Sequence, residues 1–68
     1  MTLVKVTELK ASSDKSFEDA VQQGIVRSTK TLRHVKSAWV KDFEVRVDEQ
    51  GQITEYRVLL KVSFVLDD

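Results

Sequence analysis

The stretch YRVLLKVSFVL, residues 56–66, decides the fold. Every second residue in it is aromatic or aliphatic, from Tyr56 to Leu66. A period of two over this distance predicts one long β-strand with a fully apolar face. The opposite face is mixed, so we expect part of it to meet protein too; its residues are Arg57, Leu59, Lys61, Ser63 and Val65. A chain of 68 residues is too small to cover both faces alone, which predicts an oligomer.

Composition narrows the class of protein. There is no cysteine, which excludes disulfides and thiolate metal sites. Eleven basic and eleven acidic residues balance without a basic stripe, which argues against a nucleic-acid partner. Lys5, Glu8 and Lys10 interrupt the first ten residues, so we do not expect these to be a signal peptide, and no apolar run is long enough to span a membrane. We expect a single domain over residues 1–68 in the cytoplasm, with no membrane partner.

The N-terminal half predicts a strand followed by a helix. Residues 2–10 are rich in β-formers with partial alternation. Ser13 is the expected N-cap, with Asp14 and Glu18 in the first turns, of a helix of about 18 residues. Its apolar or small stripe is Phe17, Ala20, Val21, Gly24, Ile25 and Ser28. Gly24 weakens a helix, so we expect close approach to the sheet as its compensation.

The C-terminal half predicts a long hairpin. In the strand Val35–Val47 the apolar parity changes partway, which predicts a β-bulge near Lys41 and Asp42. Residues 48–52 form the turn, with Gly51 at positive φ, before the strand of residues 52–66. The fold class is thus α+β, in the order β-α-β-β, with an antiparallel three-stranded sheet wrapped around one helix. One helix is shorter than these strands, so part of the hairpin needs neighbouring subunits.

Three segments carry a resemblance to a known family: SSDKSF at 12–17, the helix exit at 20–27 followed by TLRHV at 31–35, and the strand 56–66. With the length and element order, they resemble the dodecins, small proteins that assemble as hollow twelve-subunit shells and often bind flavins. The resemblance implies a homododecamer with helices outside and sheets inside.

The resemblance also implies a ligand site. Flavin-binding dodecins stack the flavin on a tryptophan early in the second strand, and a glutamine of the third strand contacts it. Those positions correspond to Ser37 and Arg57 here. Trp39 lies two residues on, on the same sheet face and about 6.6 Å away, so an aromatic ligand could shift with it. The Tyr56-Arg57 pair resembles a variant branch that lacks the flavin-stacking pair and is associated with calcium.

Each candidate residue has a structural alternative. Trp39 is either a ligand platform or a packing residue between subunits. Arg57 either holds a phosphate or aromatic ring, or forms an ion pair at the interface between subunits with a carboxylate such as Asp42 or Glu44. His34 either partners the helix C-terminus or binds a metal.

Carboxylates repeated by symmetry could hold calcium or magnesium, or simply lie at the surface. Asp42 and Glu44 are the candidate metal ligands; Asp48, Glu55, Asp67 and Asp68 are further carboxylates.

No catalytic motif is present, so we do not expect an enzyme. Three interpretations remain open. The first is a dodecin-like storage protein that binds FMN, riboflavin or a related aromatic ligand at Ser37, Trp39 and Arg57. The second is a similar shell without flavin that holds divalent cations or is purely structural. The third is a small oligomeric interaction module with only a fold-level likeness.

Overall fold

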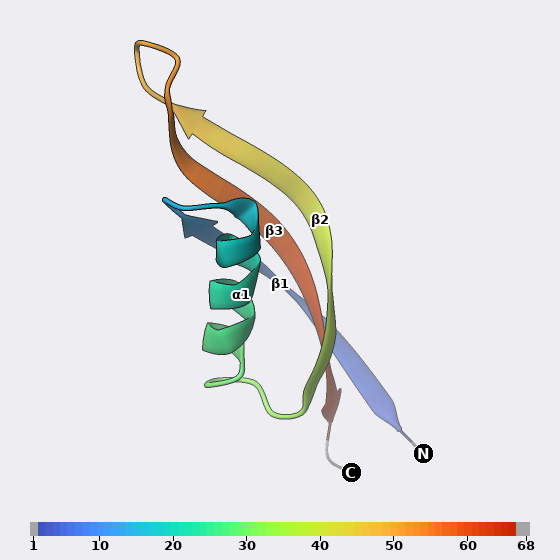
Figure 1. Ribbon diagram of the computed structural model, residues 1–68. Helices are drawn as coiled ribbons and strands as arrows, with labels where there is room; N and C mark the ends of the chain where they lie inside the picture. Colours follow the sequence, from blue (N-terminus) through green and yellow to red (C-terminus); the bar gives the residue numbers. More distant parts are fainter. Residues whose placement is uncertain (1, 67–68) are drawn as a thin grey trace.

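The protein is a three-stranded antiparallel sheet with one helix packed on one side (Figure 1). The computed structural model describes residues 2–66. The elements follow the predicted order β-α-β-β: β1 (Leu3–Ser13), α1 (Phe17–Ser28), β2 (Val35–Val47) and β3 (Ile53–Leu66). The spatial order of the sheet is β1-β3-β2, so the strand with the longest apolar period occupies its centre. No helix in this part of the chain is long and apolar enough to cross a membrane.

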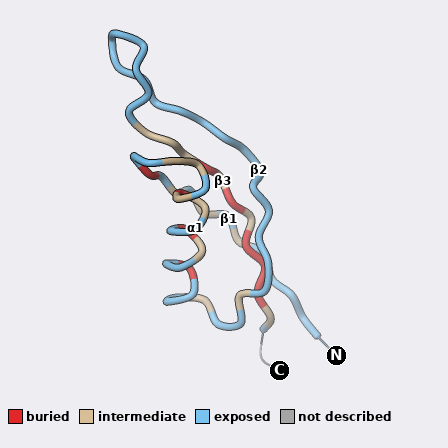
Figure 2. The backbone as a smooth tube through the Cα atoms, in the orientation of Figure 1, coloured by how far each residue is buried: buried red, intermediate tan, exposed pale blue. Residues whose placement is uncertain are grey.

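The core lies between β3 and the helix. Val58, Leu60 and Val62 of β3 are almost fully buried, as is Ala20 of α1. Figure 2 shows this buried strip along β3, whereas β2 is exposed along almost all of its length. The apolar face predicted from the alternation in residues 56–66 is therefore the face that the helix covers. The helix packs mainly against β1 and β3 and only slightly against β2.

The prediction of the helix start was wrong. Ser16, not Ser13, is the N-cap: its hydroxyl accepts a hydrogen bond from the Asp19 amide at 2.9 Å. Ser13 instead ends β1, where it pairs with Tyr56, and its hydroxyl donates to an Asp19 carboxylate oxygen at 2.6 Å. Pairing with β3 thus carries β1 three residues beyond its predicted end. The helix is correspondingly shorter than expected, with 12 residues.

Gly24 lies where the helix approaches the sheet, as predicted. A Cβ atom at this position would come within 2.9 Å of Leu60 Cδ1 and 3.0 Å of Ala11 Cβ. Both distances are shorter than normal van der Waals contact, so any larger side chain would push the helix off the sheet or displace Leu60. Because Gly24 has no side chain, the helix can pack tightly on β1 and β3.

The β-bulge in β2 is also confirmed. Val40 pairs with Leu60 and Asp42 with Leu59, so Lys41 is the extra residue. Before the bulge, Val40 lies opposite a buried residue of β3; after it, Phe43 lies opposite buried Val58. The extra residue therefore explains why the apolar parity of the sequence changes partway along the strand.

Beyond the helix, the β2–β3 hairpin projects as a two-stranded arm (Figure 1). Phe17, at the helix start, packs edge-to-face against Phe43 and Tyr56, with ring centroids 5.0 and 5.2 Å away. We call residues 45–55, which continue past this cluster, the hairpin arm. It turns at Gly51, whose φ of 80° confirms the predicted turn. The chain is 53 Å long but only 18 by 14 Å across, so the arm has little of its own chain to pack against.

Candidate functional site

All five predicted site residues lie on the sheet face that the helix does not cover, which we call the open face. On β3 the buried residues Val58, Leu60 and Val62 face the helix, so the residues between them point the other way. Residues paired across an antiparallel ladder point to the same side. The register therefore places on the open face the β2 residues Ser37, Trp39, Asp42 and Glu44, together with Arg57 of β3.

One chain does not bring these residues into a single site. Ser37 pairs with Ser63, Trp39 with Lys61, and Glu44 with Arg57. At about 3.3 Å per residue along β3, Arg57 lies about 13 Å from the Trp39 pair and about 20 Å from the Ser37 pair. A ligand that touches both Trp39 and Arg57 must therefore be long, or must bind between copies of the chain.

The Trp39 end combines an exposed indole with small hydroxyl side chains. Trp39 is 57% exposed, although it is the largest side chain of the sheet. In the neighbouring row, the hydroxyl oxygens of Ser37 and Ser63 lie 2.6 Å apart, and Ser63 is buried. These two small side chains leave space beside the indole, where a planar ligand could lie against the sheet.

The Arg57 end is a chain of ion pairs. The Arg57 guanidinium donates to the Glu55 carboxylate at 2.8 Å and lies 3.7 Å from the Glu44 carboxylate, which is itself 3.3 Å from the Lys10 ammonium. The hydrogen bond from Arg57 lowers the pKa of Glu55, and the same bond raises the pKa of Arg57. The sequence predicted an ion pair of Arg57 with Asp42 or Glu44 between subunits; the structure shows the pair with Glu44 within one chain. The pairing of Arg57 with Glu55, two residues away on the same face, was missed.

A hollow of about 370 Å³ opens beside the bulge. Its lining includes Asp42, Glu44 and Arg57, so the two predicted metal ligands do share one depression. Within residues 2–66, however, no three histidine or carboxylate side chains are grouped so that they could hold a metal ion. Asp67 and Asp68 lie outside the described residues. A cation at Asp42 and Glu44 would need ligands from further copies of the chain.

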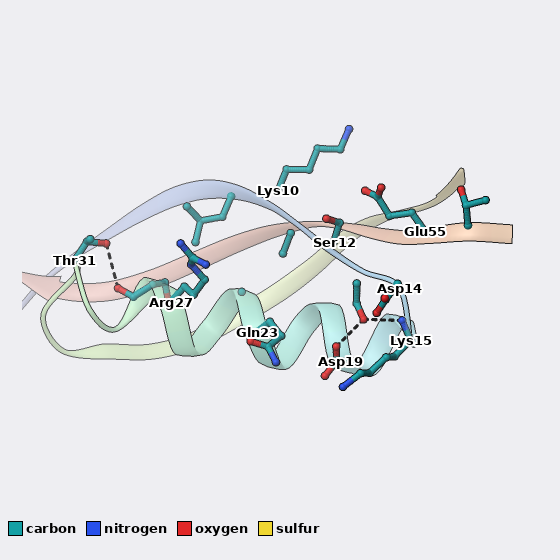
Figure 3. Close-up of a pocket in the computed structure, with 15 residues that line it drawn as sticks. Lys10, Ser12, Asp14, Lys15, Asp19, Gln23, Arg27, Thr31 and Glu55 are labelled. Atoms are coloured by element: carbon teal, nitrogen blue, oxygen red, sulfur yellow. Dashed lines mark hydrogen bonds between the residues drawn. The ribbon is translucent and has the colours of Figure 1, made fainter. Parts of the chain in front are cut away.

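A cavity of about 760 Å³ lies between α1 and β1 and contains none of the five predicted site residues. Figure 3 shows Arg27 pointing from the helix toward β1, and Lys15 and Asp19 near the helix start. Asp19 is occupied by its hydrogen bond with Ser13, whose hydroxyl also accepts from the Lys15 amide at 2.9 Å. These bonds organise the helix start, so we assign this part of the cavity wall a structural role.

The helix ends at Ser28, so His34 lies beyond its last turn. It lies in the loop before β2, in the left-handed region with φ of 58°, and its carbonyl accepts a hydrogen bond from the Val65 amide at 3.2 Å. Its backbone therefore anchors the loop to the end of β3.

Comparison with known proteins decides the family. The dodecin family model matches residues 3–67. The chain belongs to the dodecin family. A dodecin of Thermus thermophilus is 38% identical over 64 residues, which cover 94% of this chain and 91% of that protein. The crystal structure of a point mutant of that dodecin superposes with a TM-score of 0.92 at 35% identity and covers all of both chains.

A second dodecin is similar over nearly the same length. The calcium dodecin of Mycobacterium tuberculosis is 33% identical over 64 residues, 94% of this chain and 89% of that protein. Its crystal structure, described as having a calcium-binding site, has a TM-score of 0.83 at 29% identity and covers 96% and 91% of the two chains. The family and the β-α-β-β fold expected from the sequence are confirmed. The ligand of this chain is not determined by these similarities.

Proposed function

We propose that this dodecin is a homododecameric storage protein that binds a flavin, FMN or riboflavin, or a related aromatic ligand between its subunits. The observation that carries the proposal is the exposure of Trp39 on the open face of the sheet. An indole exposed to this extent beside two serine side chains offers a flat apolar surface of the kind on which aromatic rings stack.

The register supports a site between subunits. Trp39 and Arg57 are about 13 Å apart along β3, and the open face of one chain has no second wall to enclose a ring. A second copy placed against the open face would supply that wall. In such an arrangement Arg57 of one copy could lie near Trp39 of another, with Ser37 beside the indole.

Binding, and not catalysis, is the activity that these residues support. Arg57 is held by two carboxylates, and the hydroxyls of Ser37 and Ser63 are bonded to each other. None of these groups is arranged as a nucleophile with an adjacent base. We propose that the ligand is held and protected, in a protein of the cytoplasm.

The test is a titration of FMN and riboflavin that follows flavin and tryptophan emission together. Trp39 is the only tryptophan, so its emission reports directly on the proposed platform. Stacking on one aromatic side chain contributes about 1–3 kcal/mol, so Trp39→Ala should weaken binding about 5- to 150-fold. The matched control, Trp39→Phe, keeps a ring and should bind more tightly than the alanine variant.

Saturable quenching of both emissions at a fixed ratio of flavin to subunit would support the proposal. Unchanged emission of both with the assembled wild-type protein at concentrations of tens of micromolar would refute it.

The second candidate is a shell that holds calcium or magnesium at Asp42 and Glu44. Its support is the similarity to the calcium dodecin and the shared hollow beside the bulge. Lys10 and Arg57 oppose it, because they already neutralise Glu44. Calcium should then raise the melting temperature of the wild-type protein, and Asp42→Asn should remove the increase. A melting temperature that does not respond to calcium excludes this candidate.

A further inference from the structure

The cation best placed to select the ligand is Lys61, not Arg57. Lys61 lies directly opposite Trp39 in the ladder between β2 and β3, so their Cβ atoms are about 5 Å apart. Its side chain is half-buried on the open face. The sequence pattern gave Lys61 no role beyond its place on the mixed face of the last strand.

Lys61 differs from the neighbouring cations in having no carboxylate partner among residues 2–66. Arg57 is paired with Glu55 and Glu44. Lys41, the bulge residue next to the platform, lies 3.5 Å from Glu8. That carboxylate is the one that the register places beside Lys61 on its other side, across the β1–β3 ladder. The ammonium groups of Lys41 and Lys61 therefore share one carboxylate, that of Glu8. The side chains beside Trp39 on the open face thus carry a net positive charge.

A half-buried lysine side chain beside an exposed indole is matched by a ligand that is aromatic and also acidic. The ring would stack on the indole, and the acidic group would accept a charge-assisted hydrogen bond from the ammonium. Such a ligand would supply a second acidic partner, since Glu8 is shared between Lys61 and Lys41. A neutral ring would stack equally well but would leave the net positive charge of Lys41, Lys61 and Glu8 unbalanced.

We propose that Lys61 is a specificity-determining residue that makes this dodecin prefer an aromatic ligand carrying a phosphate over its neutral counterpart. The inference rests on the proposed function, because it concerns the same platform. FMN and riboflavin are suitable probes, since they share the ring and differ by one phosphate. For a partly exposed charge pair, we expect FMN to bind about 3- to 10-fold more tightly than riboflavin.

The experiment measures the ratio of the riboflavin and FMN dissociation constants for the wild-type protein, Lys61→Gln, Lys61→Arg and Lys5→Gln. Lys61→Gln should bring the ratio to about one by weakening FMN alone, and Lys61→Arg should keep the preference. Lys5→Gln is the matched control: it removes a cation whose register partner, Phe64, belongs to the helix side of β3, so the ratio should not change.

A wild-type ratio near one, or a ratio that survives in Lys61→Gln, overturns the inference while leaving flavin binding intact. Absence of binding by both flavins to the wild-type protein instead overturns the proposed function, and the inference with it. If Lys61→Gln fails to fold, the salt dependence of the wild-type ratio decides. The preference for FMN should fall as salt is added, and a ratio independent of salt would contradict an electrostatic origin.

Discussion

Replacing Val47 and Ile53 by threonine tests whether the hairpin arm is an interface between copies of the chain. Val47 is 57% and Ile53 49% exposed, so about half of each side chain is available to a neighbour. Burying a hydroxyl group without a partner costs about 1–3 kcal/mol. Two threonines, each about half available, should therefore weaken the association by about 1–3 kcal/mol per subunit, or about 5- to 150-fold. Threonine is also β-branched, so the strands themselves should persist.

The assay is sedimentation velocity over a dilution series, with circular dichroism as a check on the fold. The control is Val26→Thr, which makes a comparable exchange at a side chain of the helix that is 44% exposed. If the helices lie on the outside of the shell, this control should dissociate at the same concentration as the wild-type protein. A double arm variant that is as resistant to dilution as the control would refute the assignment of the arm to the interface.

Three further predictions concern stability. Gly24→Ala should lower the melting temperature of the protein even though alanine favours helices by about 1 kcal/mol, because overpacking against Leu60 costs about 1–3 kcal/mol; an increase would contradict the close approach. Ser16→Ala should cost about 1 kcal/mol in denaturant unfolding by removing the N-cap, and an unchanged midpoint would argue against Ser16 as the cap. The hydrogen bond from Arg57 lowers the pKa of Glu55 below the ordinary value of 4.5 that it has in the unfolded chain. The contribution of Glu55 to stability is therefore complete above pH 4.5 and is lost as the pH falls through the lowered pKa of the folded protein. The melting temperatures of wild type and Glu55→Gln should therefore converge in acid, and a constant difference would refute the linkage.

The parts of the fold that could be predicted depend on local periodicity. The alternation of residues 56–66 placed the central strand and its buried face, and the parity change in residues 35–47 located the bulge at Lys41. The helix start could not be fixed in this way. Ser13 and Ser16 are equally good caps by type, and the choice depends on whether β1 continues to pair with β3 as far as Tyr56. That pairing joins residues 43 positions apart in the sequence.

For the candidate site, the alternation of residues along each strand predicted which residues share a face of the sheet. It did not predict how far apart they lie along the strands. Ser37 and Trp39 were expected on one side of the sheet, and the register places Arg57 on that side too. Their separation along β3 depends on the register of the hairpin, which the turn and the bulges set together. The ion pair between Glu55 and Arg57 could have been predicted, since residues two apart in a strand lie on the same face. That Glu8, the register partner of Lys61, is also contacted by Lys41 could be recognised only from the structure.

The most direct test of the account is native mass spectrometry of the protein mixed with FMN. If the ligand binds between subunits against Trp39, every flavin-bearing species should contain at least two copies of the chain, and the dodecamer should dominate. A single chain that carries flavin would contradict a site between subunits. A fully assembled shell without flavin would contradict the proposed function itself.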